Sequence, residues 1–198
     1  YNKAFTPWEW HKKIFELCRK INIEVFSSPF DESAVDLLEK LNCPAYKIAS
    51  AEINHIPLLT KVAKTQKPVI ISVGLADLKD IQYAIKILKK NNCKKIIILK
   101  CVSSYPAPLE EQNLISIAEL RKRFGTLVGF SDHTIGIAAP ITAAVLGASL
   151  IEKHFNLSDN RKTVDSFFSL NDTNFRKMVK EIRDAEISIG KINFEISK

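Results

Sequence analysis

Six short runs of apolar and β-branched residues, separated by segments of helical periodicity, constrain the fold of this chain more than any other feature. The runs lie at about 24–27, 46–50, 69–73, 95–101, 127–130 and 150–153. Each is more continuous than the alternating pattern of a half-exposed strand, as expected for buried parallel strands. Helical patterns lie between them, for example at 32–41, 77–90 and 110–124. The alternation predicts an α/β protein.

Two further helical patterns open and close the chain. The first runs from Pro7 to about Ile21, and its apolar face consists of Trp10, Ile14, Leu17, Cys18 and Ile21. The last runs from about Thr173 to Ile189 and ends at Gly190, a typical C-cap residue. Between them, Asp77 is placed as an N-cap, with Asp80 three residues later.

Two architectures accommodate this pattern: an open doubly wound sheet, and a (β/α)8 barrel that lacks its first two strands. Polar residues follow the predicted strands, as in Ser131-Asp132-His133 and Glu152-Lys153-His154. An open sheet with strands about 4.8 Å apart would spread these groups over roughly 20 Å, whereas in a barrel they converge on one mouth. A complete barrel takes about 250 residues. We therefore predict one domain over residues 1–198, an incomplete TIM-type barrel of about six strand–helix units.

The composition excludes several classes of protein. With 46% hydrophobic and 26% charged residues, the chain has the profile of a globular domain. No apolar run reaches the ~20 residues of a membrane span and the start lacks a secretory signal pattern, so we expect a cytoplasmic protein with no membrane partner. The net charge of +7 favours anionic partners, but no nucleic-acid motif accompanies it and we expect no nucleic acid. The four cysteines lack paired metal spacing and are predicted to be reduced core thiols.

Lys47 is a cation inside the apolar run 45–50. Such a lysine extends its amino group to the surface, pairs with a structural carboxylate, or binds an anion. Ser28, Ser50 and Ser72 end neighbouring predicted strands and are placed to donate hydrogen bonds to the same anion. This grouping favours a carboxylate or phosphate site.

His133 and His154 come at the ends of the last two predicted strands. Neutral imidazoles at adjacent strand ends can share a divalent metal whose other positions go to water and substrate oxygen. Two histidines are also compatible with capping or supporting roles, and the spacing alone leaves both interpretations open. Glu52 and Asp165, just beyond strand ends, suit either sugar hydroxyls and proton transfer or a plain loop charge.

Several of these stretches together resemble the sialic acid synthase family. The likeness runs in family order along nearly the whole chain, and it rests on the segments 26–31 (FSSPFD), 46–50 (YKIAS), 72–74 (SVG), 105–108 (YPAP), 131–134 (SDHT) and 152–155 (EKHF). The resemblance implies metal-dependent condensation of phosphoenolpyruvate with an amino sugar on a (β/α)8 barrel. In the family a small C-terminal antifreeze-like domain normally follows the barrel and reaches the partner's active site, which implies a homodimer for the full-length protein.

The resemblance also implies roles for the residues at positions that match the family's motifs. A divalent metal, Mn²⁺ or Mg²⁺, would be held by His133 and His154. Phosphoenolpyruvate would be held by Ser28, Lys47, Ser50, Ser72, Ser103 and Ser131. The sugar would be contacted by Glu52, Tyr105 and Asp165. The residues implied to be catalytic are Lys47, Glu52, His133 and His154.

The segment 164–170 (VDSFFSL) is similar to the pseudaminic acid synthase branch of the family. A phenylalanine pair beside Asp165 suits a 6-deoxy sugar, because the methyl group of such a sugar prefers apolar contact. The implied substrate is 2,4-diacetamido-2,4,6-trideoxy-altrose, a 6-deoxy diacetamido sugar. The alternatives are an N-acetylneuraminate or legionaminate synthase.

Compared with the family pattern, the first two strands and the antifreeze-like domain are absent from residues 1–198, so the chain is expected to be truncated at both ends. This leaves a hypothesis of another class open: a non-catalytic barrel remnant that binds an anion.

Overall fold

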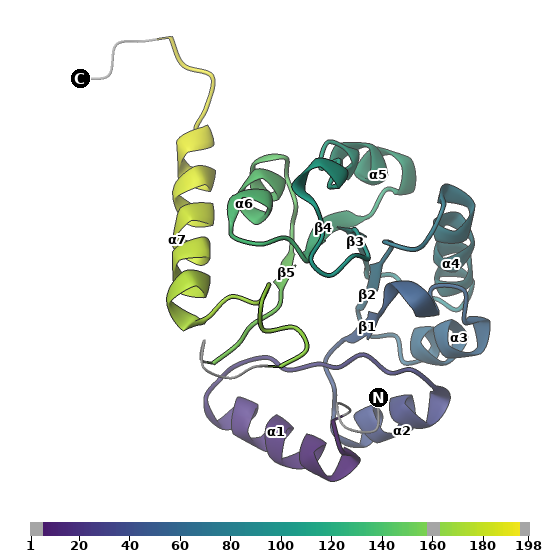
Figure 1. Cartoon of the computed structure of the whole chain (residues 1–198). Coiled ribbons are helices and arrows are strands. Elements are labelled where there is room, and N and C mark those ends of the chain that lie inside the picture. Colours follow the sequence, from purple (N-terminus) through teal and green to yellow (C-terminus); the bar gives the residue numbers. More distant parts are fainter. Residues whose placement is uncertain (1–5, 158–162, 195–198) are drawn as a thin grey trace. The chain divides into compact units, whose positions relative to one another are not determined.

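The computed structural model describes residues 6–157 and 163–194 (Figure 1). The chain divides into two compact units. Unit 1 comprises Tyr1–Ser72 and Ala76–Ile97, and unit 2 comprises Val73–Leu75 and Ile98–Lys198. Each unit is an alternation of parallel strands and helices, and strand β3 (Ile96–Cys101) belongs in part to each.

Unit 1 carries the first two strands. Its elements are α1 (Trp8–Lys20), α2 (Glu32–Lys40), β1 (Tyr46–Ile48), the 3-10 helix η1 (Ser50–Glu52), α3 (Ile56–Lys64), β2 (Val69–Ser72) and α4 (Leu78–Lys90). β1 pairs with β2 in parallel, with Lys47 opposite Ile70. The start of β3 adjoins β2, because the Val69 amide donates to the Lys95 carbonyl over 2.9 Å. Helices α3 and α4 lie side by side in this unit (Figure 1).

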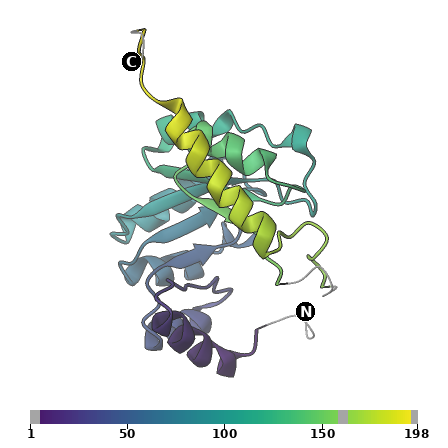
Figure 2. The same ribbon diagram turned by 90° about the vertical axis from the view of Figure 1, so that its left-hand side faces the viewer.

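Unit 2 carries the remaining strands. Its elements are the rest of β3, the 3-10 helix η2 (Leu109–Glu111), α5 (Ser116–Phe124), β4 (Leu127–Asp132), α6 (Ala138–Val145), β5 (Ile151–Lys153) and α7 (Asp172–Ile189). β4 lies between β3 and β5 and pairs with β5 in parallel, with Ser131 opposite Glu152 and Asp132 opposite Lys153. Figure 2 shows α7 lying across α6, and these helices pack against each other.

These elements establish an α/β protein of the incomplete TIM-barrel type, as predicted. Both strands β1 and β2 are buried along their whole length, which is typical of parallel strands covered on both faces. The core of unit 1 includes Ile48, Leu58 and Val62, and that of unit 2 includes Ile98 and Phe130, all fully buried. Burial of each such side chain contributes about 1.5–3 kcal/mol to stability.

Local signals set the helix ends as predicted. Asp77 caps α4 by accepting from the amides of Lys79 and Asp80, and the Asp80 carboxylate accepts from the Asp77 amide. This reciprocal capping box satisfies amides that the first helical turn leaves without partners. At the other end of the chain, α7 stops at Gly190, whose φ of 54° lies in the left-handed range that glycine adopts without strain.

Three predictions differ from the structure in detail: the strand at 24–27, the start of the helix at 110–124, and the apolar face of the first helix. The run 24–27 is no strand among the described residues, because it contributes only an isolated parallel bridge from Ser27 to Tyr46. The helix predicted at 110–124 begins only at Ser116, since residues 109–111 form a 3-10 turn and Asn113 has a φ of 44°.

The third concerns α1, whose predicted apolar face is not buried. Phe15 is its buried residue, whereas the side chains of Trp10, Leu17 and Ile21 are more than half exposed. The helix docks on unit 1 through Phe15 and through a hydrogen bond from the Arg19 guanidinium to the Leu41 carbonyl. Helical periodicity therefore predicted the helix correctly but not the face that packs.

Across the described residues, none of the helices combines the length and hydrophobicity that crossing a membrane requires.

Candidate active site

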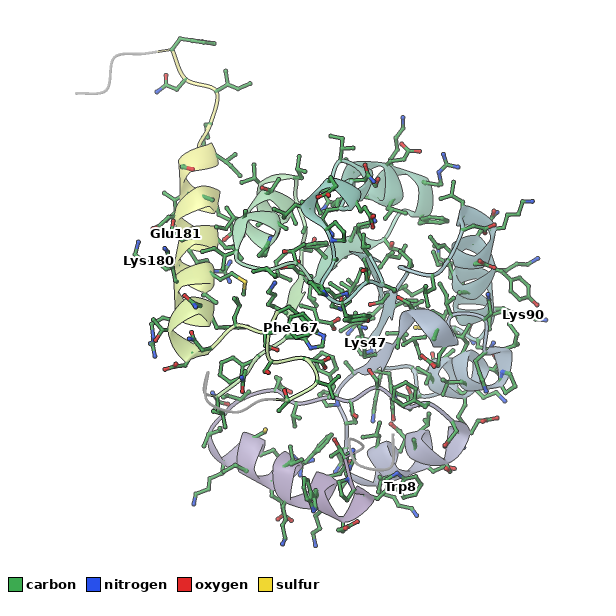
Figure 3. The ribbon with its side chains drawn as sticks, in the orientation of Figure 1. Trp8, Lys47, Lys90, Phe167, Lys180 and Glu181 are labelled. Carbon is green, nitrogen blue, oxygen red and sulfur yellow. The ribbon has the colours of Figure 1, made fainter. Side chains whose placement is uncertain are left out.

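In unit 1, a buried lysine of β1 meets a buried serine at the end of β2. Lys47 projects from the middle of β1 (Figure 3) and is 8% exposed. Its Nζ donates a hydrogen bond to Ser72 Oγ over 2.8 Å, and Ser72 is also buried. Because Ser72 accepts this bond, its own hydroxyl hydrogen stays available for another acceptor. An ammonium beside a hydroxyl donor is suited to an anion.

The other predicted residues of unit 1 are Ser28, Ser50 and Glu52. Ser50 is buried and begins η1 immediately after β1. Ser28 is half-buried and lines a cavity of about 540 Å³ together with Trp8, His11 and Phe30. Glu52 ends η1, and its Oε2 atom is buried with no hydrogen-bond partner among the described residues. A buried carboxylate oxygen without a donor is costly, and a hydroxyl of a bound molecule would satisfy it.

In unit 2, His133 and His154 follow β4 and β5 and come together as predicted. Their ring centroids are 5.3 Å apart. His133 Nδ1 lies 2.9 Å from the Val102 carbonyl oxygen. A carbonyl only accepts, so Nδ1 carries the hydrogen and Nε2 keeps the lone pair. His154 Nδ1 lies 3.5 Å from Asp165 Oδ2, which favours the same tautomer.

The pKa values of the two imidazoles are shifted in opposite directions. Burial lowers the pKa of His154, and the neighbouring His133 lowers it further. Burial also lowers the pKa of His133, but contacts with the Cys101 thiol and the Val102 carbonyl outweigh it and raise the pKa above its ordinary value. The lowered pKa favours the neutral form of His154, which is the form that binds a metal.

Aromatic rings surround the histidine pair. Tyr105 packs on His133 with ring centroids 4.3 Å apart, and Phe168 packs on His154 at 4.9 Å. Phe168 is buried, whereas the neighbouring Phe167 (Figure 3) is 61% exposed and touches Phe168 edge-on. The phenylalanine pair thus divides into one ring that supports the histidines and one that faces solvent.

Cys101 is a free, buried thiol, as predicted, but it also lies beside the histidine pair. Its Sγ lies 3.8 Å from His133 Nδ1. Burial raises the pKa of this thiol, but contacts from His133, Ser131 and Ser103 outweigh it and lower the pKa overall. Two predicted serines and one predicted histidine therefore gather around a cysteine. Its place two residues before Ser103 was the signal available in the sequence.

Charged neighbours of the two histidines were also missed. Ser131 donates a hydrogen bond to Glu152 Oε1 over 2.6 Å. Asp132 and Lys153, the residues directly before His133 and His154, form an ion pair of 2.7 Å with both side chains fully buried. Opposite charges at matching positions before two histidines were the signal for this pair.

The donor set is compatible with a divalent metal at the histidines. The described residues contain no group of three or more histidine, cysteine, aspartate or glutamate side chains arranged to hold a metal ion. His133 Nδ1 contacts the Val102 carbonyl and His154 Nδ1 lies 3.5 Å from Asp165 Oδ2, so the two Nε2 atoms are the ring nitrogens placed to hold a metal. Such a set leaves several metal positions to water and substrate oxygen.

Comparison with known proteins identifies relatives over nearly the whole chain. The model of the NeuB family matches residues 1–194. The chain is 49% identical over 190 residues to the pseudaminic acid synthase of Helicobacter pylori, covering 96% of this chain and 56% of that protein. It is 40% identical over 182 residues to the N,N'-diacetyllegionaminic acid synthase of Campylobacter jejuni, covering 91% and 54%. The chain thus spans about half the length of these relatives.

Solved structures agree. The N-acetylneuraminic acid synthetase of Leptospira borgpetersenii, crystallised in complex with citrate, superposes with a TM-score of 0.92 and 32% sequence identity. The match covers 98% of this chain and 68% of that one. The family model matches nearly the whole chain, and the relatives and the solved structure support the same assignment. The chain therefore belongs to the NeuB family of sialic acid synthases.

Proposed function

We propose that this chain carries catalytic residues of a pseudaminic acid synthase, which condenses phosphoenolpyruvate with 2,4-diacetamido-2,4,6-trideoxy-altrose to give pseudaminic acid and phosphate. The observation that carries the proposal is the His133–His154 pair, whose rings are 5.3 Å apart and whose Nδ1 atoms lie 2.9 Å from the Val102 carbonyl oxygen and 3.5 Å from Asp165 Oδ2. The 49% identity to a pseudaminic acid synthase supports the choice of substrate over the neuraminate and legionaminate alternatives. By the family's pattern, the full-length protein is proposed to be a cytoplasmic homodimer.

His133 and His154 would hold the metal, Mn²⁺ or Mg²⁺, through Nε2. When bound, the metal supplies Lewis-acid polarisation of the open-chain sugar aldehyde. The carbonyl of Val102 and the carboxylate of Asp165 orient the imidazoles for this role. Tyr105 and Phe168 pack against the rings and limit the access of water to them.

In the reaction, C3 of phosphoenolpyruvate forms a bond to the aldehyde carbon, water adds to C2, and phosphate leaves C2. The Lys47 ammonium and the Ser72 hydroxyl would bind an anionic group of phosphoenolpyruvate and stabilise its charge. Ser28, Ser50, Ser103 and Ser131 keep their predicted role as ligands of the same substrate. Glu52, with its unpartnered buried oxygen, would accept a hydrogen bond from a sugar hydroxyl, as would Asp165.

Phosphate release tests the proposal. The protein is incubated with phosphoenolpyruvate, Mn²⁺ and the altrose-derived sugar, and control reactions omit the sugar or replace Mn²⁺ with EDTA. Release that depends on the sugar and the metal is expected, with N-acetylmannosamine a poorer substrate. Faster turnover of N-acetylmannosamine would favour the neuraminate alternative. If the protein binds phosphoenolpyruvate but releases no phosphate with any related amino sugar, the proposal is contradicted and the anion-binding remnant is favoured.

A further inference from the structure

The buried ion pair between Asp132 and Lys153 has no part in the reaction proposed above. We infer that it is a positioning device that sets the separation of His133 and His154. This rests on the proposed function in one respect only, because His133 and His154 are assumed to bind the same metal.

The strand register places the ion pair directly before the histidines. Asp132 of β4 and Lys153 of β5 are partners across the sheet, and each is followed by its histidine. Lys153 Nζ lies 2.7 Å from Asp132 Oδ2. A slip of one residue between the strands would separate these charges and also the two histidines. The ion pair and the histidine pair therefore depend on the same register.

A second set of contacts holds the backbone on both sides of His133. The other carboxylate oxygen of Asp132, Oδ1, accepts a hydrogen bond from the Thr134 amide over 2.8 Å. Lys153 Nζ also donates to the Thr134 carbonyl. Lys153 thus contacts the residue before His133 and the residue after it. These contacts connect the backbone of His133 to the residue that precedes His154.

The energetics favour a positioning role over a stabilising one. Both side chains are fully buried, so each charge has lost its hydration. In such pairs the desolvation penalty offsets most of the attraction, and apolar replacements of similar size are often neutral or stabilising. A buried pair can instead specify a single arrangement of the elements that carry it. Here that arrangement is the approach of two imidazoles to 5.3 Å.

The test replaces both charges at once in the Asp132→Leu/Lys153→Met variant. The matched control is Asp184→Leu/Lys180→Met, which removes an exposed ion pair on α7 in the same unit. Three quantities are measured: Mn²⁺ affinity by calorimetry, kcat and KM for phosphoenolpyruvate, and NOEs between the two imidazole rings without metal. Should the first variant not fold, Asp132→Asn/Lys153→Gln serves instead, because glutamine is too short to reach both Asp132 and Thr134.

We expect the Asp132→Leu/Lys153→Met protein to melt within a few degrees of the wild type. Its Mn²⁺ affinity and kcat should fall at least about tenfold, as for other residues that orient metal ligands, while KM for phosphoenolpyruvate stays unchanged. Its inter-ring NOEs should weaken, and the control should match the wild type. Wild-type NOEs and affinity in the double variant would overturn the inference. A wild type that neither binds Mn²⁺ nor turns over would contradict the proposed function instead, and the NOEs would still decide this inference.

Discussion

The ammonium group of Lys47 donates a 2.8 Å hydrogen bond to the Ser72 hydroxyl, and both side chains are buried in unit 1. This contact joins two residues that lie 25 positions apart in the sequence. It places a cation and a hydroxyl donor side by side on two neighbouring strands, and it is the basis of the anion-binding role proposed for both residues.

Replacing Lys47 with methionine should weaken phosphoenolpyruvate binding. A hydrogen bond to a charged group contributes about 1.5–3 kcal/mol, so the Kd should rise by roughly 10- to 150-fold. Lys61→Met is the matched control, because Lys61 pairs with Asp36 at the surface of the same unit. Calorimetric titration with phosphoenolpyruvate measures both variants. Equal Kd values for the two would remove Lys47 from the site.

The His154→Ala variant should lose the thermal stabilisation that Mn²⁺ and phosphoenolpyruvate give the wild type. The loss is expected because one of the two imidazoles proposed to hold the metal is gone. His55→Ala is the control, since His55 caps α3 in unit 1 and is outside the histidine pair. Differential scanning fluorimetry with and without Mn²⁺ reports the shift. A variant that keeps the full shift would show that His154 does not bind the metal.

The histidines should titrate on opposite sides of the ordinary histidine pKa of about 6.5. Burial and the proximity of His133 lower the pKa of His154, while Cys101 and Val102 raise that of His133 against the effect of burial. The folded state therefore holds the His154 proton more weakly than the unfolded chain does. Consequently the His154 contribution to the free energy of unfolding is intact above pH 6.5 and falls as the pH drops through the window between its folded-state pKa and 6.5.

For His133 the sign is opposite. Its raised pKa adds stability that is present below about pH 6.5 and is lost as the pH rises through its folded-state pKa. NMR titration of the imidazole protons in metal-free protein measures both midpoints. Two midpoints in the reverse order would contradict the electrostatic description of the pair.

The neighbouring phenylalanines should respond differently to truncation. Phe168→Ala removes a buried ring that packs on His154, and should lower the free energy of unfolding by about 3–5 kcal/mol. Phe167→Ala removes a ring that is 61% exposed and should cost much less. Urea denaturation of the two variants gives the comparison. Similar losses in both would contradict a buried Phe168 beside an exposed Phe167.

Much of the fold was predictable because its signals are local. The capping box of Asp77 and Asp80 and the stop at Gly190 depend on neighbouring residues, so the sequence alone predicts them. The run 24–27 failed as a strand because strand formation also needs partners, and Ser27 bridges only to Tyr46. Likewise, periodicity predicts that α1 is amphipathic but not that Phe15 is the residue that becomes buried.

The sequence predicted the main residues of the site, but it did not predict the residues that contact them. Lys47, His133 and His154 stood out as charged or imidazole side chains next to apolar strands, and the structure brings the two histidines together. Cys101 and Lys153 were missed because their roles depend on cross-strand contacts, to His133 and to Asp132. Such contacts follow from strand register, which a single sequence does not specify.

Formation of the new carbon–carbon bond tests the synthase proposal most directly. Phosphoenolpyruvate labelled with ¹³C at C3 is incubated with the protein, Mn²⁺ and 2,4-diacetamido-2,4,6-trideoxy-altrose, and the label is followed by NMR. We expect the vinylic signal of the label to be replaced by that of a saturated CH₂ in a nine-carbon acid, in step with phosphate release and only when metal is present. Persistence of the vinylic signal with this sugar and with every related amino sugar would contradict the synthase proposal.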